Sequence, residues 1–113
     1  MLKKNKEFGY VYRKGSSVPK RDFTMIHAKS RYGGIRIGLS VSKKVGNAVV
    51  RNRVRRRMKE AMRQLLPMTH GHYAIVFVAR SGIDEVKFDS LVQQMRSALR
   101  KAGILSEQGT GKT

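Results

Sequence analysis

The stretch IRIGLSVSKKVGNAVVRNRVRRRMKEAMRQLL, residues 35–66, changes its hydrophobic period partway along. Over residues 35–42, apolar side chains alternate with small or polar ones, as they do in a half-buried strand. After Asn47, a good helix N-cap, apolar residues recur every three to four positions, which predicts a helix to about Leu66 that Pro67 ends. A strand that feeds a long helix therefore forms the centre of the predicted fold.

Shorter elements are predicted on either side of this unit. The segment YAIVFVA is apolar on both faces, which is typical of a central strand, whereas Pro19 restricts its own segment to a sheet edge. The order is a helix, two or three strands, then helix, strand and helix. It predicts an α+β fold of two layers, with the helices on one face of a small mixed sheet. The further elements are strands at 16–20, 22–29 and 73–79 and helices at 2–14 and 88–102.

Length and composition bound the class of protein. The 113 residues fit one domain, which we expect to span residues 1–105, and the polar residues 106–113 are expected to be a disordered tail. The chain has no cysteine, no apolar run long enough to cross a bilayer and no signal-peptide core at its start. A cytoplasmic protein that makes no membrane contact is the expectation.

Charge is the strongest signal in the composition. Lysine and arginine number 25 against seven aspartates and glutamates, which gives a net charge of +18. Self-repulsion on that scale favours a polyanionic partner, and nucleic acid leads because neutralised phosphates release counterions. A membrane-surface protein and a histone-like condenser are the alternatives.

The helix predicted after Asn47 is amphipathic rather than a random basic run. One stripe of its helical wheel is apolar, while the rest is of almost one sign, because only Glu60 opposes the cations between residues 51 and 59. Like charges four residues apart repel, so phosphates that match guanidinium geometry would stabilise this face, although a solvated surface is the alternative. The apolar stripe is Val50, Val54, Met58, Ala61 and Leu65. The opposite face carries Asn52, Arg56, Lys59 and Arg63. Arg51 and Arg55 flank one edge of it, and Arg53 and Arg57 flank the other. Lys43 and Lys44 extend this basic surface to the helix start.

Two further groups suit an extended nucleic-acid strand. Gly38 and Ser40 are small and share the strand face opposite the isoleucines, which leaves room for a ligand. Phe8 and Tyr12 are one helical turn apart and offer ring faces on which bases of any sequence can stack. Core packing is the alternative for these aromatics. Asn52 has several possible partners: a base, a ribose, a hydrated metal or nearby backbone.

The segment GLSVSKKVGNAVVRNRVRRRMKE, residues 38–60, resembles the signature of the bacterial ribonuclease P protein family. The core of the match is Asn47-Ala48-Val49 followed by Arg51-Asn52-Arg53, and the start KKNKEF and the segment VAR match as well. The resemblance implies an α-β-β-β-α-β-α sandwich. It also implies a left-handed β-α-β crossover, an exception to the usual right-handed rule.

The same resemblance implies a function. The family's RNA subunit hydrolyses precursor tRNA with Mg²⁺, while the protein binds that RNA and the 5′ leader of the substrate. The protein then has no catalytic residue and no metal site of its own. By position, the residues that would meet the catalytic RNA are Lys43, Lys44, Arg51, Asn52, Arg53, Arg55, Arg56 and Lys59. Those that would bind the leader are Phe8, Tyr12, Ile26 and Ser40, although the family often has an aromatic residue at the position of Ile26.

Two rival functions remain at this stage: a structural RNA-binding protein, such as a ribosomal protein, and an autonomous nuclease. His27, His70 and His72 lack the neighbouring ligands of a metal site, so the second pair is interpreted as loop residues. Few carboxylates are present, and those at residues 84–89 are interpreted as capping groups. The terminal GTGKT has Ser106 where a phosphate-binding loop needs glycine, which argues against a nucleotide cofactor.

Overall fold

The computed structural model describes residues 5–106, with side chains from residue 7 onward. It contains three α-helices, four strands and two short 3-10 helices over this range, in the order α-β-β-β-α-β-α that was predicted. The helices are α1 (Asn5–Lys14), α2 (Ala48–Leu65) and α3 (Phe88–Lys101), and the 3-10 turns are η1 (Leu66–Met68) and η2 (Ile83–Glu85). The strands are β1 (Ser16–Pro19), β2 (Phe23–Lys29), β3 (Ile35–Ser40) and β4 (Tyr73–Ala79).

The strands form one mixed sheet in the order β1-β2-β4-β3. β4 pairs antiparallel with β2 and parallel with β3, so α2 is the crossover between two adjacent parallel strands. The predicted places of β4 at the centre and β1 at the edge are confirmed. The left-handed sense of the crossover stays a prediction.

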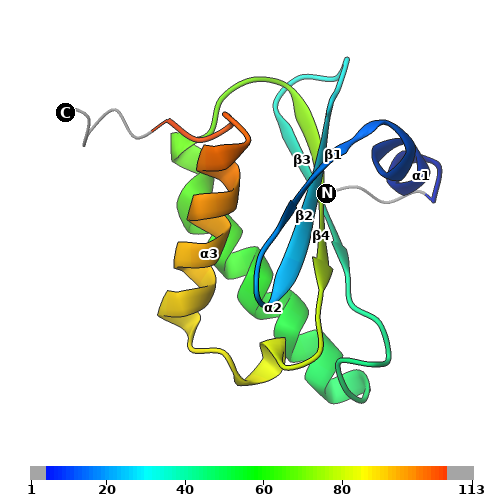
Figure 1. Cartoon of the computed structure of the whole chain (residues 1–113), viewed down its shortest axis with the longest axis vertical. Helices are drawn as coiled ribbons and strands as arrows, with labels where there is room; N and C mark the ends of the chain where they lie inside the picture. The colour runs from blue at the N-terminus through cyan, green and yellow to red at the C-terminus, as the bar shows by residue number, and fades with distance from the viewer. Residues whose placement is uncertain (1–4, 107–113) are drawn as a thin grey trace.

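The helices cover both faces of the sheet (Figure 1). α2 and α3 lie on one face, where their apolar stripes join the main core with Met25, Ile37 and Phe77. α1 lies on the other face, where Val11 is fully buried against Ala74 and Val76 of β4. The prediction that the helices pack on one face is therefore wrong for α1. Its apolar spacing predicted a helix with a buried side, but a short amphipathic pattern does not specify which face of a sheet it covers.

The predicted helix signals operate at both long helices. The Asn47 side chain caps α2 by accepting a hydrogen bond from the Val50 N–H, at 3.0 Å. Gly103 adopts a left-handed φ of 79° after α3, and the Ile104 N–H donates to the Leu99 carbonyl in a Schellman-type ending. The strand predicted at 35–42 ends at Ser40.

Both ends of the chain run beyond the described residues. Residues 2–4 of the first predicted helix and residues 107–113 of the predicted tail lie outside them. Within the described range, Leu105 is buried and the Ser106 N–H donates to the Met68 carbonyl at 2.8 Å. The chain is thus held against the protein up to the first residue of the predicted tail.

Gly15 lets the chain turn sharply from α1 into β1, close to β2. Its N–H donates to the Val11 carbonyl at 2.8 Å. A Cβ at this position would lie 2.5 Å from the Val11 oxygen, 2.8 Å from a methyl of Ile26 and 2.9 Å from the His27 oxygen. Because backbone atoms supply two of these contacts, a side chain could be accommodated only by moving α1 away from the sheet.

We therefore expect Gly15→Ala to lower the free energy of unfolding by about 1–3 kcal/mol, the usual cost of overpacking. Urea denaturation measures it. Gly33→Ala is the matched control, because its added Cβ would have its nearest neighbour at 4.0 Å, and its effect should stay within about 0.5 kcal/mol. Equal effects of the two substitutions would contradict a tight α1–β2 contact.

Candidate nucleic-acid interface

The register of α2 separates its apolar and basic sides. Val54, Met58, Ala61 and Leu65 are buried as the wheel predicted. Met62 is buried as well, and Val50 is half-buried at the edge of the core. The remaining basic positions, except Arg57, turn away from the sheet. Of the predicted residues, Lys43, Lys44, Asn52, Arg53, Arg56 and Lys59 are exposed, and Arg51 and Arg55 are half-buried.

The cations from Arg51 to Lys59 have no carboxylate partner in the part of the chain that the structure describes, whereas Arg63, one turn further along the helix, has one. Glu60, the one acid on α2, pairs with Arg63 in the next turn rather than with the cations before it. Hydrogen bonds from Arg63 lower the pKa of Glu60, and the same contact raises the pKa of Arg63. The positive charge from Arg51 to Lys59 is thus left uncompensated.

Asn52 has a local partner that was not among the predicted ones. Its side-chain oxygen accepts a hydrogen bond from Nη1 of Arg55 at 3.0 Å, one turn along the helix. The bond restrains the Arg55 guanidinium. Arg51 is restrained as well, since its Nη1 donates to the Gly46 carbonyl at 3.4 Å.

Arg57 differs from its neighbours because it points into the fold. Its guanidinium donates to the carbonyls of Asp84, at 3.5 Å, and Val86, and so joins α2 to η2 and the residue after it. Arg57 is therefore a structural residue, whereas Arg56 beside it is exposed. The wheel alone placed Arg57 at one edge of the basic face.

The four predicted leader-binding residues gather on the α1 face of the sheet. Phe8 and Ile26 are half-buried against Val11, Ala74 and Val76. Tyr12 is 48% exposed, and its ring centroid lies 6.4 Å from that of Phe8. These values favour a largely packed Phe8 and an exposed Tyr12. Ser40 lies one strand further, paired in register with Val78.

Three residues of this face escaped the sequence reasoning. Two of them, Thr24 and Val78, are partners in register. Val78 is also the partner of Ser40, so Thr24, Val78 and Ser40 lie in one row across the sheet. Arg80 follows β4 and donates from Nη2 to the Thr24 hydroxyl at 3.0 Å. The row is half-buried rather than covered, and Arg80 provides a cation at its edge. Strand alternation extended across both strands would have found it.

The two surfaces meet at the turn that follows β3. Ser40 ends the strand, Lys43 and Lys44 project from the turn, and Asn47 then starts α2. Buried Val45 anchors the turn to the core, and the Lys44 carbonyl accepts a hydrogen bond from the Ser81 hydroxyl at 3.1 Å. This turn, with its two exposed lysines, therefore connects the basic face of α2 to the α1 face of the sheet.

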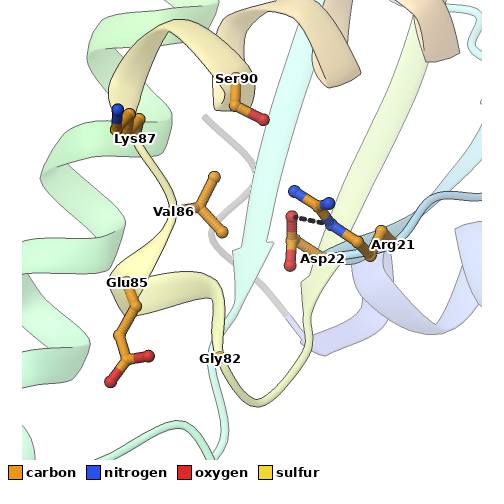
Figure 2. A pocket seen from close by; sticks show the side chains of 7 residues that line it. All are labelled: Arg21, Asp22, Gly82, Glu85, Val86, Lys87 and Ser90. Atoms are coloured by element: carbon orange, nitrogen blue, oxygen red, sulfur yellow. Dashed lines mark hydrogen bonds and ion pairs between the residues drawn. The ribbon is translucent and has the colours of Figure 1, made fainter.

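The acidic residues do not form an alternative site. A shallow pocket of about 390 Å³ at the start of α3 contains Asp22 and Glu85, but their side chains point in different directions (Figure 2). Asp22 is also engaged by Arg21 at 3.2 Å and by Gln94 at 2.7 Å. Capping is not the role of the nearby acids, since Lys87 is the N-cap of α3 and makes no side-chain capping bond.

The histidines have structural contacts. Burial lowers the pKa of His27, whose ring lies edge-on to Tyr73, and Nδ1 of His72 accepts from the Gly34 N–H at 2.9 Å. His70 is an exposed residue of the loop before β4. Among residues 5–106, no cluster of three His, Cys, Asp or Glu could hold a metal ion. Nor is any helix in this range both long and apolar enough to traverse a lipid bilayer.

Known proteins are similar to this chain in sequence and in fold. A family model described as Ribonuclease P matches residues 1–103. The ribonuclease P protein component of Clostridium botulinum strain 657 is 42% identical over 105 residues, which cover 91% of this chain and 94% of that protein. That of Brevibacillus brevis is 35% identical over 107 residues, 94% and 85% of the two chains.

Solved structures of RNase P proteins have the same fold as this chain. The RNase P protein of Staphylococcus aureus superposes with a TM-score of 0.84 at 29% identity, covering 93% of this chain and 96% of that one. The RNase P protein of Thermotoga maritima gives a TM-score of 0.81 over 88% and 94% of the chains. At 23% identity that match supports the fold alone.

Proposed function

This chain belongs to the bacterial ribonuclease P protein family, and from that premise we propose that its two exposed surfaces bind two RNAs. The basic face of α2 binds the catalytic RNA subunit. The surface beside α1 binds the 5′ leader of precursor tRNA, whose endonucleolytic removal the RNA subunit performs. One domain of residues 1–105 carries both surfaces, and the cytoplasm is the proposed compartment.

The uncompensated charge of α2 is the observation that carries the proposal. Arg53, Arg56 and Lys59 are exposed, and within the described chain no carboxylate neutralises them. Phosphates that approach this face replace repulsion between neighbouring cations by attraction and release their own counterions. Asn52 holds Arg55 through its side-chain oxygen, so less side-chain entropy is lost when that guanidinium meets a phosphate.

The leader surface suits a substrate of variable sequence. Tyr12 offers an exposed ring, and the row of Ser40, Val78 and Thr24 is only half-buried. Ring stacking accepts any base, and Arg80 is placed to meet a phosphate of the same strand. Ile26 can contribute apolar packing but not the stacking of an aromatic ring.

Mg²⁺ is the cofactor of the proposed reaction and is held mainly by the RNA subunit and the substrate. Oxygen ligands are what Mg²⁺ prefers, and the carboxylates of the described chain do not converge on one point. The protein's own contribution is to place cations beside phosphates, which reduces the concentration of Mg²⁺ that RNA–RNA docking requires. The ribosomal alternative is set aside because the family match extends over residues 1–103.

The direct test is cleavage of precursor tRNA by ribonuclease P RNA at low Mg²⁺, with and without the protein. We expect the protein to increase the rate of leader removal and to cleave nothing by itself. Absence of stimulation would refute the proposal. Cleavage by the protein alone, after all RNA has been removed, would instead establish an autonomous nuclease.

Arg55→Ala and Arg56→Ala should each weaken binding of the catalytic RNA and reduce the slope of log K against log salt by about 0.7–0.9, one phosphate contact. Filter binding over a salt series measures both quantities. Lys101→Ala is the control, because it removes the same charge from the last turn of α3, far from the start of α2 (Figure 1). If all three variants gave the same slope, net charge rather than the α2 face would control binding.

Tyr12→Ala should weaken binding of precursor tRNA by about 1 kcal/mol or more. Binding of mature tRNA, which lacks the leader, should be nearly unchanged. Tyr12→Phe retains the ring and should behave as the wild type. Affinities of the holoenzyme for both RNAs provide the comparison. An equal loss for precursor and mature tRNA would assign Tyr12 to the structure of α1 instead.

A further inference from the structure

The loop between β2 and β3 is held in place by hydrogen bonds from both sides. The Ser30 N–H donates to the His72 carbonyl at 2.9 Å, and the Gly34 N–H donates to Nδ1 of the same histidine, also at 2.9 Å. The Tyr73 N–H donates to the Gly34 carbonyl at 3.1 Å, and the Tyr32 N–H to the Ser30 hydroxyl at 3.0 Å. An exposed loop with this many bonds keeps a defined shape.

Tyr32, in the middle of this loop, is the most exposed aromatic side chain of the described residues, at 58%. One face of its ring is covered by Arg36 of β3, whose Cζ lies 5.1 Å from the ring centroid. Arg36 is held in turn by Glu7 of α1, since its Nη2 lies 3.1 and 3.3 Å from the two carboxylate oxygens. The ring is thus supported from one side and open on the other.

The surroundings of Tyr32 are basic. Lys29 and Arg31 are exposed beside it, and the Tyr10 hydroxyl donates to the Lys29 carbonyl at 3.0 Å, which ties α1 to this end of β2. Glu7, the acid of this region, already faces Arg36. The other described acids lie on α2 or around the start of α3. A partner at this end therefore meets an aromatic ring among cations.

The Tyr32 ring and Arg36 lie apart from the basic face of α2 and from the surface around Tyr12 and Ser40. Arg36 shares a sheet face with Gly38 and Ser40, but it lies near the opposite end of β3 from Ser40, where Glu7 of α1 binds it. The loop also projects from the end of the sheet opposite to the start of α2 (Figure 1). RNA bound to Tyr32 would not occupy the start of α2.

We propose that Tyr32 and Arg36 form a third RNA contact, a fixed platform on which one unpaired base stacks while Lys29 and Arg31 meet the flanking phosphates. The proposal rests on the proposed function, because it needs RNA at this end of the protein. A single ring is too small an apolar patch for a protein partner, whereas it matches the area of one base. Base stacking on a ring backed by guanidinium tolerates any sequence. The base can belong to the catalytic RNA or to the substrate.

The test compares three variants in the reconstituted holoenzyme. Tyr32→Ala removes the platform, Tyr32→Leu keeps apolar bulk without a π-system, and Tyr32→Phe keeps the ring without the hydroxyl. Affinity of each protein for the RNA subunit, and affinity of each holoenzyme for precursor and for mature tRNA, are measured separately. We expect Tyr32→Ala and Tyr32→Leu to lower the affinity for one of these RNAs about tenfold. Tyr32→Phe should have the affinity of the wild type. The RNA whose binding is lost identifies the source of the base.

Thermal unfolding controls for structure, and all three variants should unfold as the wild type does because the side chain is exposed. Wild-type affinity of Tyr32→Ala for every RNA would overturn the platform. So would retention of affinity by Tyr32→Leu, or a loss by Tyr32→Phe equal to that by Tyr32→Ala. In these cases the wild-type protein would still stimulate the RNA subunit, which distinguishes this failure from failure of the proposed function.

Discussion

The packing of α2 against the sheet is the constraint on which the rest depends. Val54, Met58 and Leu65 are buried in the main core, and their register determines which arginines face water. The fold thereby concentrates cations of one sign on one helix surface, at a cost in repulsion that burial of the apolar stripe offsets. The side of the helix that stabilises the fold is therefore opposite to the side that we propose binds RNA.

The sequence predicted this part of the protein well because the information is local. Alternation identified β3, three-to-four spacing identified α2, and Asn47 and Gly103 marked helix ends where their side chain or backbone conformation is used. The face that α1 covers could not be predicted. It follows from the sheet order and from the close approach at Gly15, which are contacts between segments distant in the chain.

Side-chain partners were also beyond the sequence. Arg56 and Arg57 are neighbours of the same type, yet one is exposed and the other binds carbonyls of residues 84 and 86. The difference arises because η2 packs beside α2, and no property of the arginines encodes that contact. The same holds for Arg80, which follows β4 and reaches the α1 face through a hydrogen bond to Thr24 on the neighbouring strand β2. The helical wheel thus separated the apolar side of α2 from its basic side, but it could not separate exposed arginines from one that is bonded within the fold.

The pair of Glu60 and Arg63 has a consequence for how far RNA can follow the helix. Because Glu60 accepts hydrogen bonds from Arg63, three residues further along α2, the uncompensated positive charge of the helix ends at Lys59. A phosphate chain that tracked α2 would gain attraction along residues 51–59 and little past this point. In the proposed interface, Glu60 would therefore mark the end of the helix surface that attracts phosphates, and one carboxylate would limit the length of RNA that the helix can hold.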